Sequence, residues 1–158
     1  MRHLLGLSAI LLTCGASSAA PWVSATISPE DPLVIAYQTD AKSGLNLTFE
    51  CYPALALLTI YVISDANWDE GASYADVVLP VFIIDGVQYG THEFDFMNWE
   101  GYESISSEGQ AGYEGFMELY QAIYQARGEI NVSYFDKSAT FSAEGAKAAI
   151  DTVENACW

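Results

Sequence analysis

An acidic loop holds the first side chains whose spacing suits chemistry. Asp65, Asn67 and Asp69 alternate along the chain, and Asp76 lies at the twelfth position counted from Asp65. Oxygen ligands at positions one, three, five and twelve are typical of an EF-hand calcium loop. Glu70, however, replaces the glycine that makes the sharp EF-hand turn, and strands are predicted on both sides. Two hypotheses stay open: a calcium site of another kind, or a solvated acidic loop without a cofactor.

Few groups could perform acid–base or nucleophilic catalysis. His92 is the one histidine outside the N-terminal segment, and the chain has no Gly-x-Ser-x-Gly motif. The alternation around His92 puts it on the same face as two phenylalanines, which is typical of a partly buried structural histidine. Carboxylate pairs drawn from Glu93, Asp95 and Glu100 offer an alternative, a small hydrolase. Because 21 acidic residues make chance proximity common, no spacing singles out a catalytic residue.

Aromatic side chains gather in the sequence around the same region. Trp68, Trp99 and Tyr102 are the members that we expect to form a contact surface for another molecule. Aromatic anchors next to carboxylates are common at protein and sugar interfaces. The alternative is that these rings fill the core.

The N-terminus has the order of a secretory signal peptide. Arg2 precedes an apolar run over residues 4–13, and small residues follow up to Ala20. Cleavage after Ala19 would leave a mature domain of residues 20–158, with cleavage after Ala20 as the second choice. Cys14 could be read as a lipid-attachment site, but Thr13 stands where Gly, Ala or Ser normally precedes such a cysteine. We therefore predict that Cys14 leaves with the signal.

The remaining chain has no apolar run of the roughly twenty residues that a membrane-spanning helix needs, so no transmembrane segment is predicted. Its two remaining cysteines, Cys51 and Cys157, form the default disulfide in an oxidising compartment. Strand alternation points Cys51 into the core, and helical spacing does the same for Cys157. These features predict a periplasmic or extracellular location.

The charge of the mature domain is extreme. After Arg2 is removed, 21 acidic residues face four basic ones, a net charge of −17, and no Lys or Arg occurs between Gly44 and Ala126. Such a surface repels phosphate backbones and anionic headgroups. Nucleic acid is therefore excluded as a partner, whereas a basic protein, divalent ions or adaptation to a salty medium stay open.

Hydrophobic periodicity predicts an α+β domain: an antiparallel sheet or β-sandwich of six to seven strands with two helices, the last linked to the sheet by the disulfide. Asp85-Gly86 suits a type I′ hairpin turn. Residues 98–112 have no clean period and are predicted as a long loop. The strands are expected over residues 32–38, 45–51, 57–63, 77–84, 87–96, 129–135 and 139–142, and the helices over about 113–127 and 143–156.

The last third of the chain resembles small secreted bacterial proteins. Residues 128–133 read Gly-Glu-Ile-Asn-Val-Ser, residues 141–150 carry a Phe-Ser-x-x-Gly turn and an Ala-rich helix, and Cys157 follows. This order is similar to the invasion-associated locus B family and to VasI-like accessory proteins of type VI secretion, and Asp85, Gly86 and Trp99 also fit it. The resemblance implies a β-rich envelope protein that acts by binding a protein partner and carries over no catalytic residue. The sequence does not define the partner's identity or the oligomeric state.

Export predicts a defined new N-terminus. When the whole chain is expressed in a bacterial host, N-terminal sequencing of the exported protein should begin at Ala20. Acylated Cys14, or a chain in the envelope that still begins at Met1, would contradict the predicted cleavage.

Overall fold

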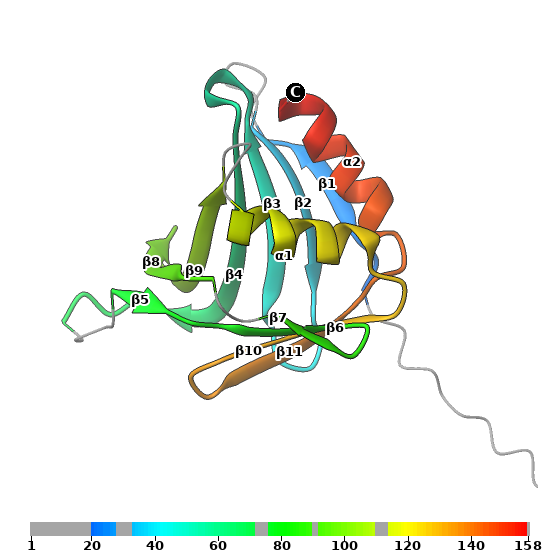
Figure 1. The fold of residues 1–158 in the computed structure, drawn as a ribbon. Coiled ribbons are helices and arrows are strands. Elements are labelled where there is room, and N and C mark those ends of the chain that lie inside the picture. Colours follow the sequence, from blue (N-terminus) through cyan, green and yellow to red (C-terminus); the bar gives the residue numbers. More distant parts are fainter. Residues whose placement is uncertain (1–19, 28–32, 72–75, 90–91, 110–113, 158) are drawn as a thin grey trace, which may run out of the picture.

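Alternating apolar residues fold into two antiparallel sheets in the computed structural model, which describes residues 20–27, 33–71, 76–89, 92–109 and 114–157 (Figure 1). The seven-stranded sheet has the order β1-β2-β3-β4-β9-β8-β5, and the four-stranded sheet has the order β11-β10-β6-β7. This architecture confirms the α+β class, the antiparallel pairing and the two helices. Its elements are β1 (Val23–Thr26), β2 (Val34–Thr39), β3 (Asn46–Tyr52), a 3-10 turn (Pro53–Leu55), β4 (Leu57–Asn67), β5 (Val77–Val78), β6 (Val81–Ile84), β7 (Val87–Tyr89), β8 (Phe94–Trp99), β9 (Tyr102–Gly109), α1 (Glu114–Gln125), β10 (Glu129–Tyr134), β11 (Lys137–Ser142) and α2 (Ala146–Cys157).

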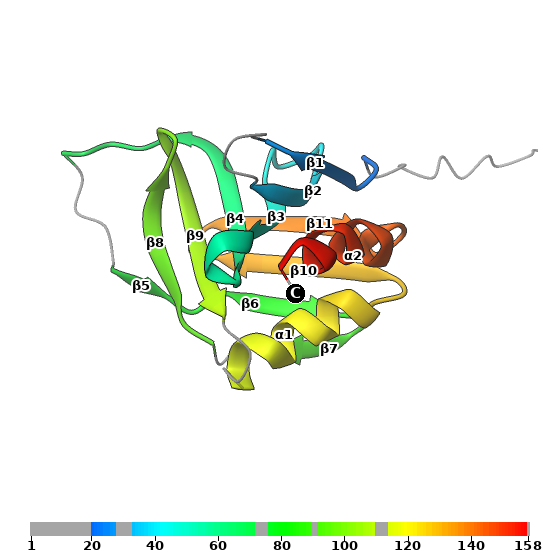
Figure 2. The ribbon, with the colours of Figure 1, turned by 90° about the horizontal axis from the view of Figure 1, so that it is seen from above.

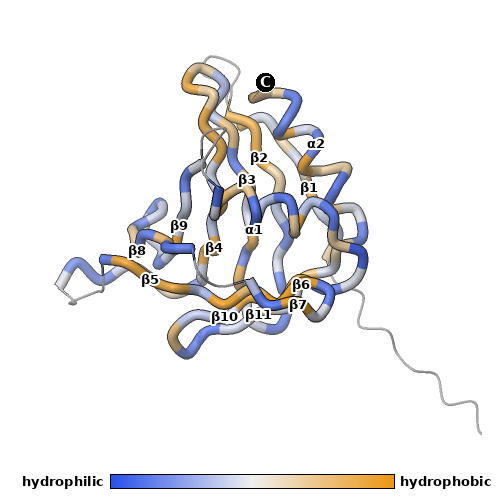
Figure 3. Tube along the Cα trace, viewed as in Figure 1, coloured by the Kyte–Doolittle hydropathy of each residue, from blue (hydrophilic) through white to orange (hydrophobic). Residues whose placement is uncertain are grey.

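Strand β9 corrects the prediction of a loop over residues 98–112. It lies inside the seven-stranded sheet, between β4 and β8, although it is largely hydrophilic (Figure 3). Hydrogen bonds of buried serines join it to its neighbours: the Ser104 hydroxyl of β9 donates to the Met97 carbonyl of β8 at 3.1 Å, and the Ser64 hydroxyl of β4 donates to the Glu103 carbonyl of β9 at 3.0 Å. Small hydroxyl side chains can therefore line a central strand without an apolar alternation, because their polar atoms are satisfied.

The chain passes from one sheet to the other at Pro80. The sequence predicts one strand over residues 77–84, but the structure divides it into β5 in the seven-stranded sheet and β6 in the four-stranded sheet. Pro80 lacks the N–H that a continuous ladder would need. The hairpin that follows turns at Asp85 and Gly86, whose φ angles of 50° and 83° suit the predicted type I′ turn.

Helix α1 crosses in front of the seven-stranded sheet (Figure 1) and lies over β6 and β7 of the four-stranded sheet (Figure 2). Its predicted apolar stripe is confirmed, since Phe116 and Tyr120 are buried and stack at 6.3 Å between ring centroids. The Phe116 ring packs directly against the backbone of Gly109 in β9, because a side-chain carbon at Gly109 would lie 1.9 Å from that ring. Gly109 therefore allows α1 to approach the seven-stranded sheet. Phe49 of β3 meets Tyr120 edge-on at 6.0 Å and extends this core.

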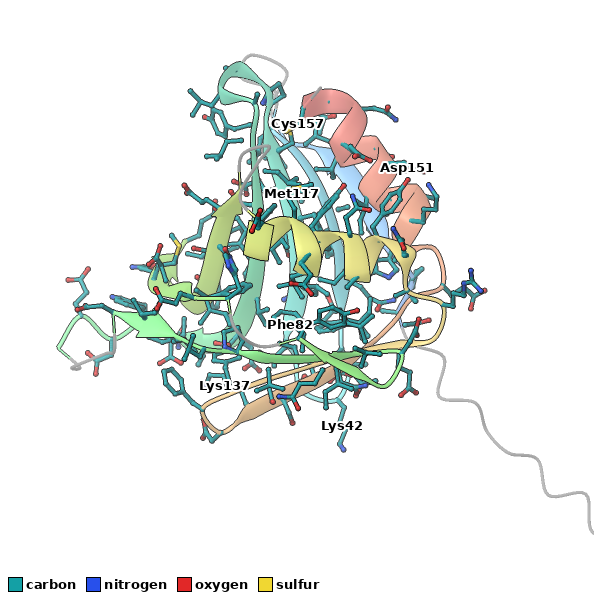
Figure 4. All side chains as sticks on the ribbon, in the orientation of Figure 1. Lys42, Phe82, Met117, Lys137, Asp151 and Cys157 are labelled. Atoms are coloured by element: carbon teal, nitrogen blue, oxygen red, sulfur yellow. A yellow bond between two sulfur atoms is a disulfide. The ribbon has the colours of Figure 1, made fainter. Side chains whose placement is uncertain are left out.

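The predicted disulfide is present. Cys51 of β3 and Cys157 at the end of α2 are bonded, with 5.8 Å between their Cα atoms, and both are buried. Cys157 lies where the end of α2 meets the seven-stranded sheet (Figure 4). The bond therefore holds the last helix on the sheet, as the two hydrophobic patterns indicate.

Side chains from β2 and from the segments next to it and to β1 hydrogen-bond to backbone groups of the edge strand β11. The buried Gln38 accepts a hydrogen bond from the Ser142 N–H at 2.8 Å and donates to the Ala20 carbonyl at 2.5 Å. The Asp40 carboxylate accepts from the backbone N–H of Thr140, and the Trp22 indole donates to the Ser142 carbonyl at 2.7 Å. These contacts join β11 to β2 and to the segment that begins at Ala20.

The predicted signal peptide, residues 1–19 with Cys14, lies outside the described residues. Within the described ranges, no helix combines the length and apolar character needed to cross a bilayer.

Removal of the disulfide should lower stability strongly. The two cysteines are separated by 106 positions, and the chain-entropy model gives roughly 4–5 kcal/mol for a loop of about this length. In a urea titration, the free energy of unfolding of Cys51→Ala/Cys157→Ala is therefore expected to be lower than that of the wild type by most of this amount. Reduced wild-type protein serves as the matched control and should unfold at a similar urea concentration. Equal stability of the variant and the oxidised wild type would contradict the role of the bond.

Candidate interaction surface

Three aromatic side chains from distant parts of the sequence meet at one end of the sheets. Trp68 follows β4, Phe96 belongs to β8, and Phe135 lies in the turn between β10 and β11. Phe96 is central, with ring-centroid distances of 5.6 Å to Trp68 and 5.7 Å to Phe135. We call these three residues the Phe135 cluster.

Phe135 is the unusual member of the cluster. Its side chain is 63% exposed, and its backbone has a φ of 49°, in the left-handed region. A bulky residue in this region costs roughly 1–2 kcal/mol relative to an ordinary conformation. Residues held in such conformations gather at functional sites. An exposed, strained phenylalanine is therefore a better candidate for a binding residue than for a structural one.

The turn geometry explains how Phe135 reaches this position. Tyr134 and Lys137 are the last paired residues of the hairpin, so Phe135 and Asp136 form a two-residue connection. Such connections favour Asn, Asp or Gly because a positive φ is required. The β6–β7 hairpin uses Asp85-Gly86 in this way, whereas the β10–β11 hairpin places an aromatic ring at the same kind of position.

The surroundings of the cluster are acidic. Asp69 and Glu70 directly follow Trp68, and Asp136 directly follows Phe135; all three are exposed. The nearby cation is already paired, since the Lys137 ammonium lies 3.3 Å from the Glu103 carboxylate. Carboxylates beside an exposed aromatic ring favour Lys and Arg side chains, which bind to both.

Of the three residues predicted to form an aromatic contact surface, only one belongs to the Phe135 cluster. Trp68 joins the Phe135 cluster, but Trp99 and Tyr102 form a cross-strand pair at the end of the β8–β9 hairpin. Strand alternation puts Trp99 on the face of the sheet opposite to Phe96. Tyr102 is 42% exposed there. Sequence reasoning did not select Phe135; the signal available was an aromatic residue between two alternating strands, at a turn.

The proposed calcium ligands are spread over different elements. Asp65 and Asn67 belong to the end of β4, and Asp76 directly precedes β5. The Asp69 carboxylate accepts the Gly71 N–H at 2.9 Å, which closes a local turn. Among the described residues, no three His, Cys, Asp or Glu side chains gather closely enough to hold a metal ion. Residues 72–75 of this loop lie outside the described residues, so the calcium hypothesis stays a prediction.

His92 is partly buried and is held against β9. Its Nε2 atom is the hydrogen-bond partner of the Ser107 hydroxyl, and its ring meets Phe94 and Phe116 edge-on. Ser107 is only 5% exposed, so its hydroxyl is not presented to a substrate. Gly115 leaves room for the imidazole, because a side-chain carbon there would lie 3.1 Å from Nδ1. The geometry supports a structural role for this pair rather than a nucleophile with its base.

The candidate catalytic carboxylates are all exposed. Glu93 precedes β8, Asp95 lies within it, and Glu100 stands in the β8–β9 turn. A glycosidase acid normally needs a buried environment that keeps it protonated near neutral pH. The structure provides no such environment for these three side chains.

The chain matches no known family model, no curated protein and no solved structure. The resemblance to the locus B and VasI-like proteins therefore stays a prediction.

Burial of His92 should make the free energy of unfolding depend on pH. Desolvation lowers the pKa of His92 below its ordinary value of 6.5, and the neighbouring Glu93 opposes this only in part. The unfolded chain therefore takes up the proton first, so that stability falls as the pH falls through about 6.5. His92→Gln keeps a hydrogen-bonding group without titration. In urea unfolding from pH 8 to pH 5, the free energy of unfolding of the wild type should fall relative to that of His92→Gln as the pH is lowered. A difference independent of pH would contradict the burial of a neutral His92.

Proposed function

We propose that this protein is an exported, non-enzymatic binding protein of the bacterial envelope that recognises a partner protein with a basic surface through the Phe135 cluster. The observation that carries the proposal is Phe135 itself, an exposed phenylalanine kept in a left-handed turn. Two costs, the strained backbone and the exposed ring, persist at the same residue. Binding of a partner would offset both.

The cluster is already organised for binding. Phe96 supports Phe135 from β8, and Trp68 supports Phe96 from the end of β4. A ring that is held in place loses little conformational entropy when a partner covers it. Aromatic anchors of this kind supply a large share of the binding energy in protein interfaces.

The charge supports a basic partner. The mature domain has a net charge of −17 by sequence, and the exposed carboxylates of Asp69, Glu70 and Asp136 adjoin the cluster. Complementary charge accelerates association and disfavours acidic competitors. The Cys51–Cys157 disulfide supports an oxidising compartment, the periplasm or the extracellular medium, as the place where such a partner would be met.

Replacement of Phe135 should separate binding from stability. Asn adopts left-handed backbone more readily than Phe, so Phe135→Asn is expected to unfold at the same urea concentration as the wild type or a higher one. Loss of a central aromatic anchor costs about 2 kcal/mol or more, a roughly thirtyfold increase in Kd. Leu55→Asn is the matched control because Leu55, in the 3-10 turn, is 64% exposed and lies outside the cluster.

The wild type, Phe135→Asn and Leu55→Asn are each used to capture partners from envelope extract and medium. The Kd between each of the three and the captured protein is then measured. Support requires one Lys- and Arg-rich protein that binds wild type and Leu55→Asn, is released at high salt, and binds Phe135→Asn at least tenfold more weakly. Equal binding by Phe135→Asn, or an acidic partner insensitive to salt, would overturn the proposal.

A further inference from the structure

A separate pocket opens where the first half of α1 meets β7 and β8. It has a volume of about 200 Å³. Phe82 of β6 forms part of its floor and lies between α1 and the four-stranded sheet (Figure 4). The lining residues are Pro80, Phe82, Gln88, Tyr89, His92, Phe94, Gly115, Glu118 and Leu119.

The floor and the rim of this pocket differ in chemistry. Phe82, Phe94 and Leu119 are buried and provide an apolar floor. Gln88 and Glu118 are exposed and stand at the rim. An apolar floor with polar groups placed around it is a form that small-molecule sites take.

The volume limits the size of the occupant. A cavity of about 150 Å³ can hold benzene. A pocket of about 200 Å³ therefore suits one ring, or an alkyl chain of similar volume, with a short polar tail. It is too small for a sugar chain or a folded segment of protein.

The charge of the lining limits the chemistry of that tail. Of the described lining residues, Glu118 is the carboxylate, and none is Lys or Arg. Burial lowers the pKa of His92, so its imidazole is neutral at pH 7 and adds no positive charge. The adjoining depression shares Tyr89 and Glu118 with the pocket and adds Glu114, so the rim faces a second carboxylate.

We propose that this pocket binds a small organic cation, an amine whose apolar body lies against Phe82, Phe94 and Leu119 while its ammonium group meets the Glu118 carboxylate. Anionic ligands are disfavoured by the carboxylates at the rim and by the net charge of the domain. The site is distinct from the Phe135 cluster and does not rest on the proposed function.

The probe for this site is phenethylamine, with 2-phenylethanol as a neutral ligand of nearly the same shape. Titration of the isotope-labelled protein, followed by amide NMR, should give saturable shifts of Gln88, Tyr89, His92 and Gly115. The wild type should bind the amine about 1.4-fold to fivefold more tightly than the alcohol, the range for one exposed charge pair. Glu118→Gln should remove this preference and leave binding of the alcohol unchanged.

Glu114→Gln is the matched control. It removes an equal charge from the same helix, but Glu114 does not line the pocket itself. If Glu114→Gln keeps the preference for the amine, the assignment to Glu118 is supported. An equal loss of this preference in both variants would show that the acidic surface as a whole attracts the amine, and would overturn the proposal. Equal affinity for both ligands in the wild type, or shifts confined to other amides, would also overturn the proposal. Phe135→Asn should bind the amine normally, so failure of the interaction proposal leaves this result unaffected.

Discussion

The approach of α1 to the seven-stranded sheet is the contact on which the rest of the fold depends. Phe116 lies against the backbone of Gly109, where any side chain would collide with its ring. Tyr120 continues the same stripe and meets Phe49. With α1 in this place, the inner faces of both sheets share one core. The helix also forms one wall of the pocket beside β7 and packs its first turn against His92.

Much of this fold could be predicted from local patterns. The periods of α1 and α2 and the alternation of β3 and β10 identify the buried residues correctly, because a single face of each element is apolar. The pairing of Cys51 with Cys157 follows from the same patterns together with the number of cysteines. Strand β9 could not be predicted in this way, because it lacks an apolar alternation and its burial depends on hydrogen bonds of serine hydroxyls between neighbouring strands. The change of sheet at Pro80 likewise depends on tertiary structure.

The candidate surface was harder to predict than the fold. Trp68 could be selected as an aromatic residue in an acidic loop, but its partners Phe96 and Phe135 come from strands that only the topology brings together. Strand alternation separates Trp99 from Phe96, which a list of aromatic residues cannot show. The conformation of Phe135 arises from the length of its hairpin connection, since two residues must turn the chain whatever side chains they carry. Composition indicated the sign of the charge but could not locate a pocket.

The contacts of Gln38 and Asp40 with β11 bear on how the protein behaves in concentrated solution. Exposed strand edges are templates for association between molecules. Here the edge of β11, a strand of six residues, bonds to side chains of its own chain, while the edge strands β5 and β7 have two and three residues. Of the other edge strands in the described part of the chain, β1 is the longest, with four residues, and α2 packs against it. Combined with strong mutual repulsion between acidic molecules, this short edge favours a protein that stays dispersed and resists fibril growth at high concentration.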